Sequence, residues 1–123
     1  MENVEILLVE DNAGDAVLIR QILAEASVPV NLHIARDGEQ AMLMMGEGLF
    51  QPDLIILDLN IPRITGPALL ERWKSLEVPI VVFSSSLNEA ERERVLALGA
   101  REFIQKPADM DAFTAAVYGI VER

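Results

Sequence analysis

The chain has 123 residues, of which 51% are hydrophobic and 24% are charged, and its formal net charge is −10. This length and composition exclude intrinsic disorder and favour one domain, over residues 1–123, with a core of its own. No apolar run approaches the roughly 18 residues of a membrane span, and no signal peptide is recognisable, so we expect a cytoplasmic protein. The acidic balance disfavours nucleic acid and membranes as partners. The absence of cysteine excludes disulfides and thiolate metal sites.

Short apolar runs alternate with helical patterns along the whole chain. In chain order, we predict a strand at 4–9, a helix at 15–25, a strand at 31–35, a helix at 39–47, a strand at 54–58, a helix at 66–76, a strand at 79–83, a helix at 88–98, a strand at 102–104 and a helix at 109–121. Asn88 and Asp109 are suited to N-cap two of these helices, and Gly99 to end one. The first helix is expected to bury Val17, Leu18 and Ile22.

Five strand–helix units in this order predict an α/β fold, a single-domain (βα)5 doubly wound sheet of five parallel strands with helices on both faces. The strand order does not follow from the pattern itself. We expect the flavodoxin-like order 2-1-3-4-5, because its switch point lies between the first and third strands. That order would bring Asp11 beside Asp58.

Polar side chains follow four of the predicted strands, at the point where each strand ends. Glu10 and Asp11 follow the first strand, Asp58 the third, Ser84 the fourth and Lys106 the fifth. The carboxyl ends of parallel strands meet at one edge of a sheet, where ligands of such folds bind. These carboxylates, the hydroxyl and the ammonium are together the groups that a site for a divalent cation and a phosphoryl group requires.

Carboxylates brought together at this edge would repel each other unless a cation lay between them. Mg²⁺ suits such a site because it prefers oxygen ligands and needs only one or two carboxylates. Zinc is disfavoured because His33 is the one histidine, and we expect His33 to pack or lie at the surface.

These residues belong to a wider set of dispersed motifs, which are Glu10-Asp11, Asp58-x-Asn60-x-Pro62-x-x-x-Gly66, Ser84-Ser85 and Gly99-Ala100-x-x-Phe103-x-x-Lys106-Pro107. In this order and spacing the chain resembles a bacterial two-component response-regulator receiver domain. The stretch from Glu10 to Ile19 is similar to stand-alone receivers that are paired with phytochrome-like histidine kinases.

The resemblance implies that Asp58 accepts a phosphoryl group from a histidine kinase or phosphotransfer protein, with Mg²⁺ as cofactor. It implies that Asp11 holds the metal directly and Glu10 through water, together with Asp58 and the backbone carbonyl of Asn60. Ser84 and Lys106 would hold the phosphoryl oxygens.

Three further expectations concern residues around this site. Asn60 and Ser86 would flank the acyl phosphate and tune its lifetime. Phe103, which stands where many relatives have tyrosine, would turn inward with Ser84 and change the surface of the fourth helix, fifth strand and last helix, where an unknown downstream protein would bind. The Lys106–Pro107 bond is predicted to be cis, because cis bonds occur mainly before proline and a tight turn here would aim Lys106 at Asp58.

Three other functions remain to be weighed against a receiver. A flavin-binding module would need bare N–H groups after the first strand, where Glu10 and Asp11 instead repel phosphate. A phosphohydrolase would need a general acid near Asp58, and Asn60 stands two residues on. A relic receiver would lack some site residues, but all are present. We expect no output domain after the last helix, so that the domain either acts directly on a partner or is part of a larger hybrid protein.

Overall fold

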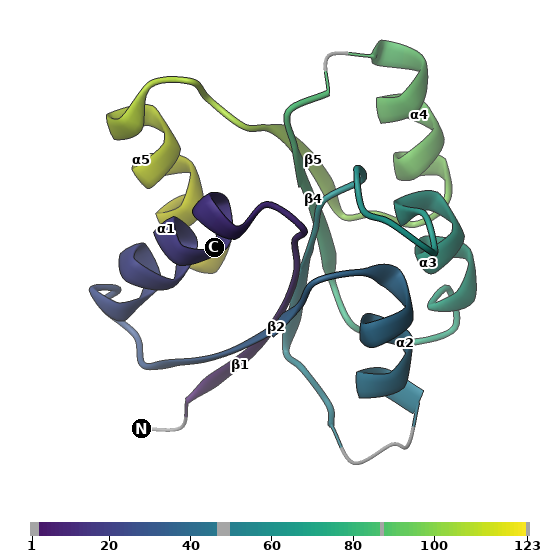
Figure 1. Cartoon of the computed structure of the whole chain (residues 1–123), viewed down its shortest axis with the longest axis horizontal. Helices are drawn as coiled ribbons and strands as arrows, with labels where there is room; N and C mark the ends of the chain where they lie inside the picture. The colour runs from purple at the N-terminus through teal and green to yellow at the C-terminus, as the bar shows by residue number, and fades with distance from the viewer. Residues whose placement is uncertain (1–2, 47–49, 87, 123) are drawn as a thin grey trace.

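In the computed structural model, which describes residues 3–46, 50–86 and 88–122, strands and helices alternate along the chain (Figure 1). They are β1 (Val4–Val9), α1 (Ala13–Ala24), β2 (Val30–Ala35), α2 (Gly38–Gly46), β3 (Leu54–Leu57), α3 (Gly66–Arg72), β4 (Ile80–Ser84), α4 (Glu89–Ala97), β5 (Glu102–Gln105) and α5 (Met110–Val121). The strands form one parallel sheet in the order β2-β1-β3-β4-β5, so the predicted fold class and strand order are confirmed. No helix in the described ranges is long and apolar enough to cross a bilayer.

Alternate residues of the central strands supply two separate cores, one on each face of the sheet. On one face Leu7 and Ile55 pack with the side chains of α2, α3 and α4. On the other face Ile6 and Ile56 pack with α1 and α5. Figure 1 shows these two helix layers on either side of the sheet. Because successive side chains of a strand point to opposite faces, a wholly apolar strand is what a sheet covered on both faces requires.

Local signals place most of the helix ends. Asn88 accepts hydrogen bonds from the backbone N–H groups of Ala90 and Glu91, and Asp109 accepts one from Ala112, so both are N-caps as predicted. Gly99 follows α4 with a φ of 109°, a left-handed conformation that glycine adopts without strain.

Two predicted features of the helices are wrong. Val17 is 54% exposed, whereas Ile22 is buried and Leu18 is half-buried against the core, as predicted. Helix α1 also buries Ala16, Ile19 and Leu23. The sequence 15–25 is apolar on more than one side, so only packing selects the buried stripe. Helix α3 ends at Arg72 rather than at residue 76, because the chain turns at Trp73 to enter β4. The predicted end of α2 at residue 47 lies outside the described residues.

The predicted cis bond before Pro107 is also wrong: the described residues contain no cis peptide bond. The Lys106 N–H donates to the Ser84 carbonyl at 2.8 Å, and the lysine side chain still reaches Asp58 with a trans bond. The turn therefore needs no cis geometry, and trans is the more stable isomer before proline by about 0.5–1 kcal/mol.

Candidate phosphoryl-acceptor site

Backbone hydrogen bonds bring the ends of the strands to one edge. The Glu10 N–H donates to Ala35 at 2.9 Å, and the Asp58 N–H donates to Val9 at 3.0 Å. Each residue that follows a strand is therefore held by its neighbouring strand. This pairing puts the side chains of Glu10, Asp58, Ser84 and Lys106 at the carboxyl edge of the sheet, where the sequence predicted them.

The ammonium of Lys106 is the centre of this site. Its Nζ lies 2.6 Å from Oε1 of Glu10, 2.8 Å from Oδ2 of Asp15 and 2.9 Å from Oδ2 of Asp58. The side chains of Lys106, Glu10 and Asp58 are 7%, 1% and 8% exposed, whereas that of Asp15 is 30% exposed. One positive charge thus faces three carboxylates, two of which are shielded from solvent.

The two buried carboxylates have further partners that fix their orientation. Oδ1 of Asp58 accepts the backbone N–H of Asn60 at 3.0 Å, and Oε2 of Glu10 accepts that of Asn12 at 3.1 Å. Ser84 is fully buried at the end of β4, and its Oγ accepts the N–H of Ser86 at 3.4 Å.

The same environment shifts the two carboxyl groups in opposite directions. Burial and the neighbouring Asp58 raise the pKa of Glu10 to about 7. Burial also acts to raise the pKa of Asp58, but its contact with Glu10 and its hydrogen bonds from Asn60 and Lys106 outweigh burial and hold that pKa below its ordinary value. Burial likewise opposes the charge of Lys106, but Asp15, Glu10 and Asp58 raise its pKa well above the usual range. Of the two buried carboxyl groups, Asp58 is therefore the one that stays ionised at neutral pH.

The raised pKa of Glu10 predicts an unusual dependence of stability on pH. Between about pH 5 and pH 7 the folded protein holds a proton that the unfolded chain releases, so stability falls as pH rises, by up to about 3 kcal/mol in total. Asp58 and Lys106 titrate outside this window, because their shifts are downward from 3.8 and upward from 10.5. Urea unfolding of the metal-free protein should show the fall, and Glu10→Gln should remove it. An equal slope in wild type and Glu10→Gln would contradict this assignment.

The donor chemistry of the site fits a hard divalent cation. Glu10 and Asp58 offer carboxylate oxygens at one edge, and Asp11 follows Glu10 in the chain. The pKa of Glu10 is raised by burial and, after that, by the neighbouring Asp58, whose negative charge a bound cation would offset. The three carboxylates around Lys106 bind its ammonium, and within the described ranges no group of three acidic, histidine or cysteine side chains is arranged to hold a metal ion by itself. Mg²⁺ does not require one, since it commonly keeps several waters and takes one or two carboxylates.

Asp15 is the site residue that the sequence did not predict. It lies in the first turn of α1, where an acidic residue is expected only to stabilise the helix through its favourable interaction with the helix dipole. Its contact with Lys106 spans 91 positions of the sequence. The sequence offered one weak signal for this contact. Asn12 directly follows the predicted site residues Glu10 and Asp11, and as the N-cap of α1 it accepts the N–H of Asp15, so the first turn of α1 begins beside the site.

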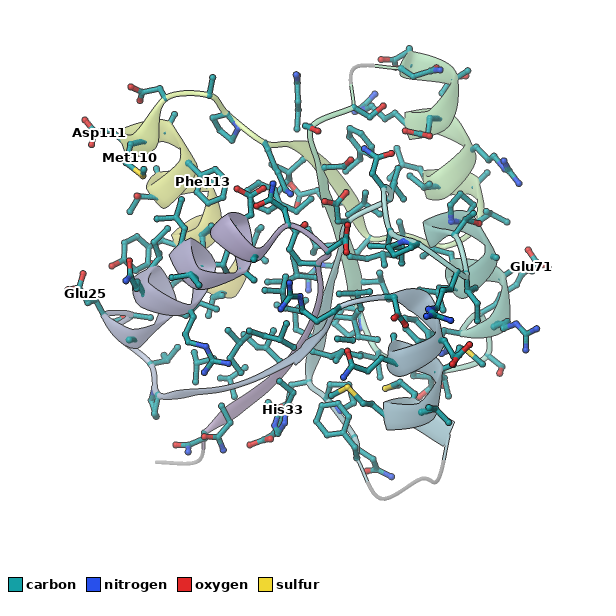
Figure 2. All side chains as sticks on the ribbon, in the orientation of Figure 1. Glu25, His33, Glu71, Met110, Asp111 and Phe113 are labelled. Carbon is teal, nitrogen blue, oxygen red and sulfur yellow. The ribbon has the colours of Figure 1, made fainter. Side chains whose placement is uncertain are left out.

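The remaining predicted residues lie around the cluster rather than within it. Asn60 is exposed and Ser86 is half-buried. Phe103 is half-buried and lines a cleft of about 320 Å³ with Ser86, Arg92 and other residues of α4 and β5. His33 takes no part in the site: its ring packs on Phe50 and its Nε2 lies 2.9 Å from Glu5. In Figure 2 His33 lies in the lower part of the view, away from Met110, Asp111 and Phe113 at the start of α5.

Comparison with known proteins identifies the family to which this fold belongs. A sequence model described as the response regulator receiver domain matches residues 6–118. This chain belongs to that family. It is a receiver domain of two-component signalling, and the resemblance found in the sequence is confirmed.

Relatives of the receiver domain include both short and long response regulators. Rcp1 of Synechocystis sp. is 32% identical in an alignment that covers 94% of this chain and 84% of Rcp1. The transcriptional regulatory protein DltR of Streptococcus agalactiae is 32% identical over 91% of this chain. The match spans only 49% of DltR, so the receiver domain has about half the length of that relative.

Two solved structures agree with the receiver domain over nearly its full length. The phosphorylated cyanobacterial phytochrome response regulator RcpA is 37% identical, with a TM-score of 0.91 over 98% of this chain and 93% of RcpA. The Mn²⁺-bound form of Rcp1 is 31% identical, with a TM-score of 0.88 over 95% of this chain and 91% of Rcp1.

Proposed function

We propose that Asp58 accepts a phosphoryl group from a histidine kinase or a phosphotransfer protein, in a reaction that requires Mg²⁺. The observation that carries the proposal is the buried Asp58 carboxylate held by Lys106 at 2.9 Å, between Glu10 and the end of β4. Two structural relatives are described as a phosphorylated and a metal-bound response regulator, which supports the same chemistry here.

Asp58 is the nucleophile because its environment keeps it ionised, whereas Glu10 is partly protonated near neutral pH. A carboxylate oxygen of Asp58 forms a bond to phosphorus as the bond from phosphorus to the donor's leaving atom breaks. Lys106 is placed to bind an oxygen of the incoming phosphoryl group, and the buried hydroxyl of Ser84 can donate to another. The chain acts here as a phosphoacceptor that assists its own modification.

Asp11, Asp58 and the backbone carbonyl of Asn60 would hold Mg²⁺, with Glu10 acting through water. The carboxylates at the end of β1 and after β3 support this ligand set. When bound, the cation would neutralise charge on the carboxylates and on the transferred phosphoryl group. Asn60 and Ser86 are proposed to flank the acyl phosphate and to tune its rate of hydrolysis.

The proposed signalling surface consists of α4, β5 and α5. Phe103 supports it, because this half-buried ring lies beside the N-terminal end of α4 and packs against the core beneath. Movement of Ser84 toward a phosphoryl group would leave volume that the ring could fill, and packed interiors do not leave such volume empty. The likeness to RcpA favours a phytochrome-like kinase as the donor.

Incubation with acetyl phosphate tests the proposed function directly. We expect one phosphoryl group per chain by intact mass in the presence of Mg²⁺, and almost none in excess EDTA. Peptide mapping should place the group on the segment that contains Asp58. Equal uptake with and without Mg²⁺, or a group on a different segment, would overturn the proposal.

A further inference from the structure

The contact between Asp15 and Lys106 occupies a lysine that is proposed to bind the phosphoryl group. A lysine ammonium has three N–H donors. In this structure Nζ has three carboxylate partners, on Glu10, Asp15 and Asp58. Lys106 therefore has no donor left for a phosphoryl oxygen until one of these partners gives way.

Asp15 is the partner that can give way most easily. Glu10 is almost fully buried and is also bound by the N–H of Asn12, whereas the Asp15 side chain is 30% exposed. A carboxylate in the first turn of a helix is stabilised by the helix dipole and can be solvated by water. Releasing Asp15 from Lys106 consequently costs less than releasing Glu10.

The surroundings of Asp15 provide room for this release. Asp15 and Lys106 line an open cavity of about 400 Å³, together with Leu18, Ser85, Met110 and Phe113. Met110 and Phe113 lie on α5, which lies beside α1 (Figure 2). The Asp15 carboxylate can therefore move toward solvent without disturbing either core.

We propose that Asp15 is a positioning residue that acts as a latch on Lys106 and competes with the phosphoryl group for its ammonium. The latch rests on the proposed function of Asp58. In the unmodified protein Asp15 holds Lys106 beside Asp58. On phosphorylation Lys106 exchanges Asp15 for a phosphoryl oxygen, so the latch lowers the affinity of the site for the group that it accepts.

The test measures binding of beryllofluoride, a non-covalent mimic of the phosphoryl group, in the presence of Mg²⁺. We expect Asp15→Asn to bind it about fivefold more tightly than wild type, on the scale of a partly exposed ion pair. Asp15→Glu, which can still reach Lys106, should stay close to wild type. The NMR signal of the Lys106 side chain should shift in Asp15→Asn even without beryllofluoride, which a role in helix stability alone would not cause.

Asp111→Asn is the matched control, because it removes one carboxylate from the exposed first turn of α5 near the same cavity. Figure 2 shows Asp111 directed outward. Its beryllofluoride affinity should equal that of wild type.

Unchanged affinity in Asp15→Asn, or an equal gain in Asp111→Asn, would overturn the latch while leaving the acceptor role of Asp58 intact. Failure of wild type to take up a phosphoryl group at Asp58 would instead overturn the proposed function, and the latch with it.

Discussion

Asp58→Asn should reduce the rate of phosphoryl uptake from acetyl phosphate in the presence of Mg²⁺ by at least about 100-fold, because the variant lacks the proposed nucleophile. The amide keeps the size of the side chain, and its oxygen can still accept the N–H of Asn60. It lacks the negative oxygen that attacks phosphorus. Time courses of intact mass, followed for wild type and variant at equal concentration, measure the effect.

Neighbouring carboxylates make this experiment discriminating. Glu10 and Asp15 contact the same ammonium as Asp58, so each is an alternative acceptor that the experiment must exclude. Asp11 follows Glu10 in the chain and is a third carboxylate to exclude. Asp111→Asn, an exposed change of the same chemistry, should retain the full rate. Uptake by Asp58→Asn at the rate of Asp111→Asn would show that another carboxylate is the acceptor.

Lys106→Met should lower the free energy of unfolding of the metal-free protein by about 3 kcal/mol near pH 8, the cost expected when one partner of a buried ion pair is removed. The variant keeps an unbranched side chain but leaves Glu10 and Asp58, which are 1% and 8% exposed, without their counter-charge. Near pH 5 the loss should be smaller, because Glu10 can then be protonated. Urea unfolding at both pH values measures these differences.

The matched control for this prediction is Lys74→Met. Lys74 is exposed, and an ordinary surface substitution changes stability by no more than about 0.5 kcal/mol. Mg²⁺ should restore part of the stability lost in Lys106→Met and have less effect on Lys74→Met, since the cation would replace the missing charge. If the two variants were equally stable, Lys106 would not be the counter-charge that the buried carboxylates require.

Much of the fold could be predicted because its signals are local. The apolar runs of β1, β3 and β4 are buried on both faces, and such runs are typical of a covered parallel sheet. The helix caps at Asn88 and Asp109 depend on bonds within three residues. The strand order was expected from the doubly wound fold class and not from any residue pattern.

Other features were decided by packing between distant segments. Whether Val17 or Ile19 faces the core depends on how α1 rotates against the sheet and α5. Whether the bond before Pro107 is cis or trans depends on the route by which Lys106 reaches the site, since the two isomers differ little in intrinsic stability.

The sequence by itself determined that carboxylates, a hydroxyl and an ammonium meet at one edge of the sheet, because strand direction and strand ends follow from short-range patterns. Only the tertiary structure decided how the charges pair there. Asp15 joins Lys106 across 91 positions, and the pKa values of Glu10 and Asp58 move in opposite directions. The physical reason is that electrostatic energy depends on distances of a few ångströms and on burial, and neither quantity exists until the segments have packed.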